Sequence, residues 1–233
     1  MMRSLGNMLF RVRNILFPVL YLTLFIGRPP AGDTPAIALI AGTLVVLSGQ
    51  GIRILTVGLD YIVRGGRQRQ VYASRLVQSG LFAHCRNPLY LGNLMMIAGF
   101  GIVAGNLLYL TLILPLFFFF YACIIVAEEH YLQERFGEEY RQYCVRTPRL
   151  LPETTGLAGT LRAFPFNWRR VLVKEYSTIC ITLLLLILLW ARQLNHTLTD
   201  WLITACAVAL TLLACAGIRA LKKSGKLSAG PSS

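Results

Sequence analysis

Two adjacent glutamates, Glu128 and Glu129, end an apolar run and begin a strongly charged segment. Residues 127–152 read AEEHYLQERFGEEYRQYCVRTPRLLP and directly follow the apolar run LLYLTLILPLFFFFYACIIVA. Hydrocarbon does not accommodate so much charge, so this segment is expected in water at a membrane surface. A helix C-terminus carries partial negative charge and favours cations. The two carboxylates therefore indicate either a helix that continues past them or a site for a cationic ligand.

Continuation of the helix is supported by apolar and aromatic residues that recur at helical spacing after the glutamates. Gly137 weakens this interpretation, because glycine inside a helix costs roughly 1 kcal/mol relative to alanine. The sequence thus leaves both explanations open. The residues at helical spacing are Leu132, Phe136, Tyr140 and Tyr143.

The bulk properties indicate an all-α, polytopic membrane protein. The chain has 233 residues, of which 55% are hydrophobic, and a mean hydropathy of +0.59. Its net charge of +13 is concentrated between the apolar runs, which positive-inside bias and anionic lipid headgroups explain without nucleic acid. We predict one membrane domain over residues 1–233, with a core at 36–152 and a C-terminal part at 153–233.

The apolar runs predict about six transmembrane helices, with a water-exposed helical segment after the fourth. Gly105 and Asn106 form a connection so short that the third and fourth spans must be an antiparallel hairpin. That hairpin returns residues 80–92 to the membrane side of the two glutamates. The tail KKSGKLSAGPSS, residues 222–233, is predicted to be disordered. The expected spans are 15–26, 36–59, 88–104, 107–127, 176–190 and 201–221.

The arginines and lysines predict which side of the membrane the site faces. With six spans, only Arg28 and Arg192 fall in the short loops assigned outside, and Arg53 lies within a span. Both termini and the charged segment are therefore expected in the cytosol.

The six cysteines and three histidines show no metal-binding spacing, so no metal site is predicted. Four cysteines fall within apolar runs, where we interpret them as small packing residues. These are Cys123, Cys180, Cys206 and Cys215.

A second polar segment, GLFAHCRNPLYLGN at residues 80–93, leads into the third span. Pro88 suits the first turn of a helix, where its missing N–H would have no partner, and Asn87 is a fair N-cap. Helix initiation leaves three residues of the segment unexplained: Arg86, Tyr90 and Gly92.

Together the two segments resemble the isoprenylcysteine carboxyl methyltransferase and phospholipid methyltransferase superfamily. Its pattern runs Gly-Pro-Tyr, Arg-His-Pro-x-Tyr-x-Gly, Glu-Glu-x-x-Leu, and Phe-Gly-x-x-Tyr-x-x-Tyr before a proline. The likeness covers roughly residues 45–152. The residues that match in register are Arg86, Pro88, Tyr90, Gly92, Glu128, Glu129, Leu132, Phe136, Gly137, Tyr140, Tyr143 and Pro148.

The resemblance implies a membrane enzyme that uses S-adenosylmethionine and no metal. This cofactor carries an ammonium and a sulfonium, for which the paired glutamates are apt partners. Arg86, Asn87 and Tyr90 would hold its carboxylate. The cofactor-binding residues that the resemblance implies are Phe82, Arg86, Asn87, Pro88, Tyr90, Gly92, Glu128 and Glu129.

The resemblance also implies a lipophilic or lipidated methyl acceptor that is reached from the bilayer. A carboxylate acceptor of the isoprenylcysteine type requires an arginine clamp, for which Arg86 and Arg146 are the catalytic candidates. Of the two reactions considered, we expect this carboxyl O-methylation. N-methylation of an ethanolamine headgroup is the alternative, since Asn87 replaces the usual histidine, as in the eukaryotic phosphatidylethanolamine methyltransferases, and Gly49-Gln50-Gly51 matches their GxG.

Two other classes stay open. The segment YRQYCVRTP is similar to the end of NADPH-dependent membrane enzymes of the sterol-reductase type. Against that class, Glu128 and Glu129 would repel a nucleotide phosphate. A transporter or scaffold is the non-enzymatic class, but the sequence shows no internal repeat of the kind that transporters carry.

Overall fold

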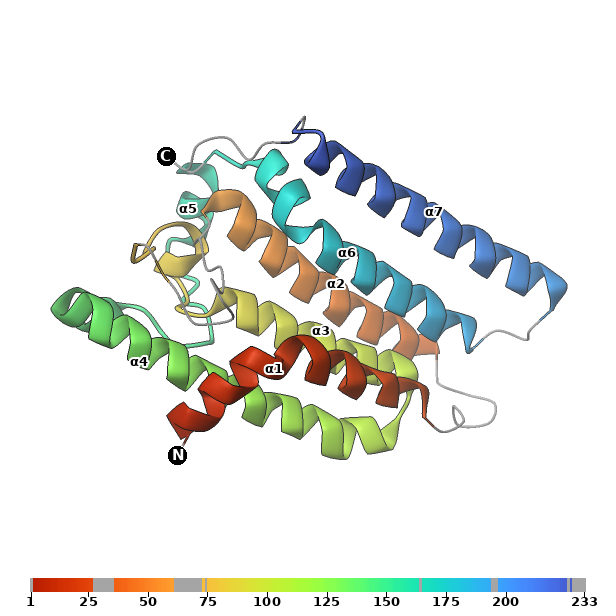
Figure 1. The fold of residues 1–233 in the computed structure, drawn as a ribbon, viewed down its shortest axis with the longest axis horizontal. Helices are drawn as coiled ribbons and strands as arrows, with labels where there is room; N and C mark the ends of the chain where they lie inside the picture. The colour runs from red at the N-terminus through yellow and green to blue at the C-terminus, as the bar shows by residue number, and fades with distance from the viewer. Residues whose placement is uncertain are drawn as a thin grey trace.

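The computed structural model of the chain consists of helices that run back and forth along a common direction (Figure 1). It describes residues 2–26, 36–60, 73, 75–163, 165–193, 197–225 and 227, and these contain no strand. The elements are α1 (Met2–Leu22), η1 (Thr23–Phe25), α2 (Ala36–Leu59), η3 (Gly80–Ala83), α3 (Pro88–Ala104), η4 (Tyr109–Ile113), α4 (Leu114–Arg146), α5 (Leu157–Ala163), α6 (Trp168–Ala191) and α7 (Leu198–Lys223).

The protein is an all-α polytopic membrane protein. In the described part of the chain, five helices are long and apolar enough to cross a membrane: α1 with η1, α2, η4 with α4, α6 and α7. The third predicted span is α3, which is apolar but has only 17 residues. The first helix begins at Met2 rather than Ile15. It extends further because Leu9 and Phe10 pack in the core while Arg11 on the same helix is exposed.

The predicted hairpin between α3 and α4 is present. Gly105 ends α3 with a positive φ of 59°, a conformation that suits glycine at a helix C-terminus. The Asn106 side chain then donates to the carbonyl oxygens of Thr23 and Ile26, which ties the turn to the end of the first helix. The chain therefore reverses here, and α4 returns towards the end of the bundle where α3 began (Figure 1).

The helix does continue past the two glutamates, but it is broken at Gly137. The backbone of this residue has φ 53° and ψ −118°, which lies outside the helical region. Beyond the break the helix resumes and ends at Arg146. Tyr140 and Tyr143 pack with Leu132 in a small cluster separate from the main core. Both sequence-based considerations were thus partly right: the helix continues, and glycine interrupts it.

The helices α2 and α3 approach closely along a line of glycines. A Cβ on Gly92 would lie 2.7 Å from the carbonyl oxygen of Gly49, and one on Gly49 would lie 2.6 Å from the carbonyl oxygen of Gly92. Gly99 and Gly42 make the same kind of contact one heptad further along. These glycines therefore let the two backbones touch.

Polar side chains attach α6 to this pair of helices. The Arg53 guanidinium of α2 donates from Nε and Nη2 to the two oxygens of Glu175 of α6, at 2.9 and 2.7 Å, and from Nη1 to Asn93 Oδ1 of α3 at 2.6 Å. Thr182 of α6 donates to Gln50 of α2 at 3.0 Å. The arginine within the second span thus faces the bundle interior and is paired there.

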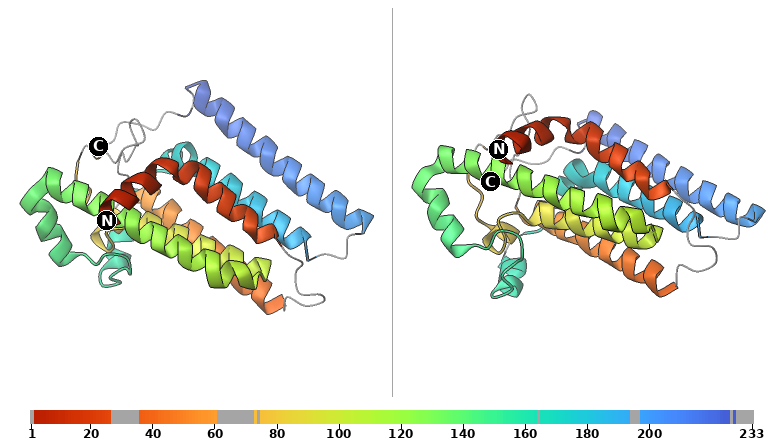
Figure 2. Two further views of the ribbon diagram at one scale, coloured as in Figure 1. Left: turned by 60° about the horizontal axis from the view of Figure 1, so that its bottom comes forward. Right: turned by 90° about the horizontal axis from the view of Figure 1, so that it is seen from below.

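The last helix, α7, lies outside the bundle beside α6 (Figure 2). None of its residues is buried. A disulfide joins Cys215 of α7 to Cys180 of α6. The sequence-based interpretation of these two cysteines as packing residues was therefore wrong, whereas Cys123 is a buried free thiol in the core.

Candidate functional site

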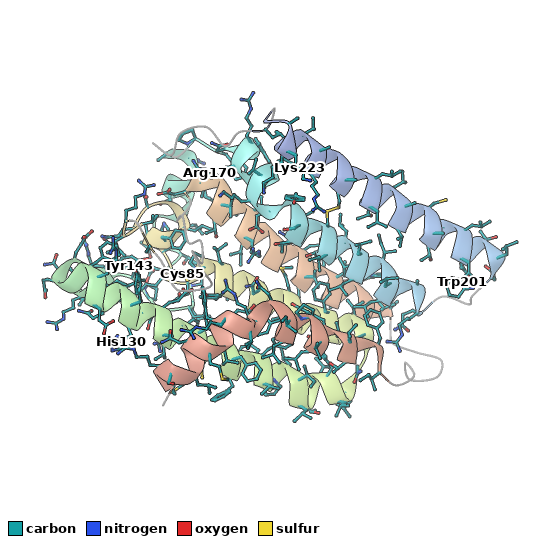
Figure 3. All side chains as sticks on the ribbon, viewed as in Figure 1. Cys85, His130, Tyr143, Arg170, Trp201 and Lys223 are labelled. Carbon is teal, nitrogen blue, oxygen red and sulfur yellow. A yellow bond between two sulfur atoms is a disulfide. The ribbon has the colours of Figure 1, made fainter. Side chains whose placement is uncertain are left out.

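The segment before α3 is held against the end of α4 and the residues that follow it. The Tyr143 hydroxyl donates to the carbonyl oxygen of Phe82 at 2.7 Å, and the backbone N–H of Arg86 donates to the carbonyl oxygen of Pro148 at 2.9 Å. Cys85 and Tyr143 mark this contact in Figure 3. The two sequence segments that were predicted to meet are thus joined by backbone hydrogen bonds.

Glu129 lies between two arginines. Its Oε1 is 3.2 Å from Arg86 Nη1, and Arg149 approaches both carboxylate oxygens, with Nε 3.0 Å from Oε2. Asn87 donates to the carbonyl oxygen of Arg149 at 3.0 Å, with a longer contact of 3.5 Å to Glu129. Without a ligand, the charge of Glu129 is therefore already balanced by protein cations. Water screens the Arg149 pair more than the Arg86 pair, because the Arg149 side chain is 51% exposed and that of Arg86 is 16% exposed.

Glu128 has a different environment. It is 4% exposed, and its Oε1 accepts a hydrogen bond of 2.5 Å from the hydroxyl of buried Tyr90. Although the glutamates are neighbours in sequence, one faces the arginines and the other faces the interior of the bundle.

A small pocket, which we call the polar pocket for its four charged side chains, is enclosed by the segment before α3, the two glutamates and the aromatic residues of α4, including Tyr140. Its wall also contains apolar residues, among them Leu132. Its volume is about 10 Å³, which is room for about one water molecule. Arg86 Nε is buried in this region, and no described residue accepts a hydrogen bond from it. An unsatisfied buried donor of this kind is suited to an acceptor atom of a ligand.

Charge and burial set the ionisation of two groups here. Burial lowers the pKa of the Arg86 guanidinium, but the Glu129 carboxylate and Cys144 outweigh this, so its pKa stays above the ordinary value. Burial raises the pKa of the Cys85 thiol to about 11. Arg86 is therefore a permanent cation, and Cys85 is a protonated thiol that donates to Leu150 O at 3.0 Å rather than a nucleophile.

A second, larger cavity of about 540 Å³ lies among the membrane-spanning helices α1, α2, α3, α4 and α6. Its wall combines apolar side chains with a few polar ones, among them Arg13, Arg53 and Asn93. Tyr90 and Glu128 also line it. The Glu128 side chain lines both cavities, so the hydrogen-bonded pair of Tyr90 and Glu128 lies at the boundary between them.

Six of the predicted site residues come together around these two cavities: Phe82, Arg86, Asn87, Tyr90, Glu128 and Glu129. Three do not line either cavity. Pro88 is buried at the start of α3, and Gly92 packs against Gly49. Arg146 is exposed and donates to the carbonyl oxygen of Gln142 at 3.3 Å, within its own helix.

Sequence reasoning missed Arg149, which contacts Glu129. Helix α4 ends at Arg146, and Thr147 is extended, so the chain turns back and brings residue 149 to the site. The signal that was available is Pro148, which a helix does not continue through. Asn93 and Glu175 were also missed, and for Glu175 the unpaired Arg53 in the second span was the signal, because a buried arginine requires a partner.

Among the described residues, no group of three or more histidine, cysteine, aspartate or glutamate side chains is placed to hold a metal ion.

Comparison with known proteins shows similarity to one family and to two metal-resistance proteins. Residues 37–139 match the family model described as phospholipid methyltransferase. The nickel-cobalt-cadmium resistance protein NccN of Alcaligenes xylosoxydans xylosoxydans is 27% identical over 141 residues, which is 60% of this chain and 62% of that protein. The cobalt-zinc-cadmium resistance protein CzcN of Cupriavidus metallidurans is 30% identical over 118 residues, 50% of this chain and 52% of that protein. No solved structure matches the chain significantly.

The chain thus spans between about half and about three fifths of the length of these two relatives. The family match includes α2, α3 and α4 up to residue 139, and therefore the paired glutamates, Arg86 and Tyr90. Helices α1, α6 and α7 lie outside it. Over residues 37–139 the chain is therefore similar to the phospholipid methyltransferase family.

Proposed function

We propose that the protein transfers a methyl group from S-adenosylmethionine to a lipophilic acceptor drawn from the bilayer. The observation that carries this proposal is the pair of Tyr90 and Glu128 at the boundary between a polar pocket and a cavity among the spanning helices. A water-soluble donor and a membrane-embedded acceptor would meet at this pair.

The residues of the polar pocket fit the amino-acid end of the cofactor. Carboxylates suit an ammonium and a sulfonium, and the unsatisfied Nε of Arg86 suits a carboxylate. When bound, the cofactor supplies a methyl group on a sulfonium for in-line displacement, which depends on positioning rather than on a covalent nucleophile. The pocket has room for about one water molecule. Arg75 and Arg149, whose side chains are both 51% exposed, would move outwards to admit the ligand.

We propose carboxyl O-methylation as the reaction. Arg86 lines the polar pocket and not the larger cavity, so we assign it to the carboxylate of the cofactor rather than to that of the acceptor. N-methylation of an ethanolamine headgroup is the second candidate, and one observation favours it. Glu128 is a buried carboxylate at the boundary between the two cavities. In that position it can hold an ammonium and accept its proton before transfer.

The test is a transfer assay with full-length protein in nanodiscs, methyl-labelled S-adenosylmethionine, and panels of prenyl-cysteine and aminophospholipid acceptors. We expect label in a lipophilic product and stronger thermal protection by S-adenosylhomocysteine than by NADPH. Protection by NADPH alone would instead support a reductase. If only aminophospholipids were labelled, the acceptor would be an amine and the proposal of a carboxylate acceptor would be wrong.

We further propose that the site faces the cytosol, as the basic residues of the sequence predict. Thr155 and Thr199 are both exposed. Thr155 follows α4, at the site end of the bundle, and Thr199 begins α7 at the end marked by Trp201 (Figure 3). After the free cysteines are replaced, Thr199→Cys should react with a membrane-impermeant thiol reagent in intact cells and Thr155→Cys should not. The reverse pattern would place the site outside.

A further inference from the structure

We propose that Arg13 of α1 binds the oxyanion of an amphiphilic ligand inside the larger cavity, and that this oxyanion belongs to the methyl acceptor. The proposal rests on the proposed function, since it identifies the chemistry of the acceptor at the same site. A carboxylate and a phosphate ester share this chemistry, and the experiment below separates them.

The first observation is that Arg13 has no anionic partner. Its side chain is half-buried and lines the cavity. The guanidinium carbon lies 3.9 Å from the centroid of the Phe10 ring, an interaction that offsets only part of the loss of water. No carboxylate in the described part of the chain forms an ion pair with it.

The second observation is that the other charged groups of the cavity wall are matched by protein atoms. Arg53 is paired with Glu175 at 2.7 Å, and Glu128 accepts a hydrogen bond from Tyr90. Arg13 is therefore the arginine of this wall that no carboxylate of the described residues pairs with, and the wall beside it also includes Phe17 and Leu185. A cation in such surroundings is stabilised by an anion with hydrogen-bond acceptors, which an oxyanion provides.

The third observation is that the cavity connects this cation to the reaction site. The wall that contains Arg13 also contains Tyr90 and Glu128. A ligand whose oxyanion is held at Arg13 thus has its polar head in the same cavity as the pair that borders the cofactor pocket. The volume of about 540 Å³ lies within the usual range for a single small-molecule ligand.

The packing of the helices indicates where the apolar tail of the ligand lies. Both α1 and α6 line the cavity, yet α1 packs mainly on α4, and α6 packs mainly on α2 and α7, rather than on each other. Ile181 of α6, which lines the cavity, is 56% exposed. The tail would therefore leave between α1 and α6 towards the bilayer. Both helices lie outside the family match.

Photolabelling of the full-length protein in phosphatidylcholine nanodiscs tests the proposal. Three probes with the same saturated chain and a diazirine near the head are compared, namely a fatty acid, an alkyl phosphate and an alcohol, and labelled residues are mapped by mass spectrometry. We expect one or both acidic probes to label cavity residues about tenfold more than the alcohol, as for a charged hydrogen bond. A preference for the acid indicates a carboxylate ligand, and one for the phosphate indicates a phospholipid headgroup.

Three variants make the test specific. Arg13→Gln should abolish the preference for acidic probes, and Arg13→Lys should keep most of it. Arg11→Gln is the matched control, because Arg11 is exposed on the same helix and does not line the cavity. Equal labelling by acid, phosphate and alcohol would overturn the proposal. So would unchanged labelling in Arg13→Gln, or an equal loss in Arg11→Gln, which would indicate general attraction of anions to the membrane surface.

Binding of S-adenosylhomocysteine, measured by calorimetry on the same preparations, separates this proposal from the proposed function. We expect Arg13→Gln to bind it like the wild type, which also shows that the variant is folded. Selective labelling without cofactor binding would support the Arg13 site and contradict the methyltransferase proposal. Cofactor binding without selective labelling would support the methyltransferase proposal and contradict the Arg13 site.

Discussion

The polar pocket and the larger cavity meet at one pair of residues but are built in different ways. The polar pocket draws its charged side chains from two short segments, 75–90 and 128–149, which a backbone hydrogen bond from Arg86 to Pro148 joins. The cavity takes its polar residues from several helices far apart in sequence, such as Arg13 of α1, Asn93 of α3 and Thr182 of α6. A sequence motif can therefore predict the polar pocket but not the larger cavity.

The two regions also balance charge differently. In the pocket, Glu129 is shared between a half-buried and an exposed arginine, so one partner can be exchanged for a ligand. In the cavity wall, Arg53 and Glu175 are 12% and 5% exposed and hold three helices together with Asn93. We infer that exchangeable pairs serve binding here, whereas fixed pairs serve the architecture.

The largest effect is expected from breaking the fixed pair. Glu175→Gln leaves the Arg53 cation buried without its counter-ion, which should cost about 3 kcal/mol of stability. Thermal unfolding of the full-length protein in nanodiscs would measure this as a lower midpoint. Cofactor affinity of the molecules that remain folded should not change.

A double variant provides the control for this prediction. Arg53→Met with Glu175→Met removes both charges and keeps side chains of similar length, so most of the lost stability should return. If the double variant is as unstable as Glu175→Gln, the pair is not what attaches α6.

Breaking the exchangeable pair at Glu129 should lower the affinity for the cofactor rather than the stability. Glu129→Gln removes a charged hydrogen-bond acceptor, and we expect it to weaken S-adenosylhomocysteine binding by about 2 kcal/mol, with little change in thermal stability. Calorimetry measures the affinity. Exposed Glu134 of the same helix is bonded to Arg3 and supplies the matched control as Glu134→Gln. Equal effects of the two substitutions would show that only general charge matters.

Much of the fold was predictable because apolar runs, prolines and the Gly105 turn act locally. The meeting of Arg86 with the two glutamates was predictable as well, since a hairpin of short connection fixes which ends lie together. The contact of Arg149 with Glu129 was not predictable, because it depends on where α4 ends and the chain turns back. Arg53 and Glu175 lie on helices that are far apart in the sequence, so no periodicity in the sequence predicts their pairing.

Gly92 distinguishes a packing role from the cofactor role that the resemblance implied. A Cβ at this position would lie 2.7 Å from Gly49 O and from Arg53 Cγ. Gly92→Ala should therefore destabilise the protein by about 1.5 kcal/mol through overpacking, without changing cofactor affinity. Gly51→Ala is the control, because nothing lies within 4 Å of a Cβ there. If Gly92→Ala lowered the cofactor affinity and left the stability unchanged, Gly92 would have a cofactor-binding role instead.

The smallest effects concern the two arginines near the end of α4. Arg149 contacts Glu129 but is 51% exposed, so Arg149→Gln should change cofactor affinity by only about 0.5 kcal/mol, as for a solvent-exposed ion pair. The direction of this change is informative. If Arg149 merely competes with the ligand ammonium for Glu129, its removal strengthens binding, and if it also holds the ligand carboxylate, its removal weakens binding. Arg146 donates to Gln142 of its own helix, makes a longer contact of 3.5 Å to Gln78, and lines neither cavity, so Arg146→Gln should leave affinity unchanged. Calorimetry on the matched pair decides between them, and an Arg146 effect larger than that of Arg149 would mean that the end of α4 rearranges when the cofactor binds.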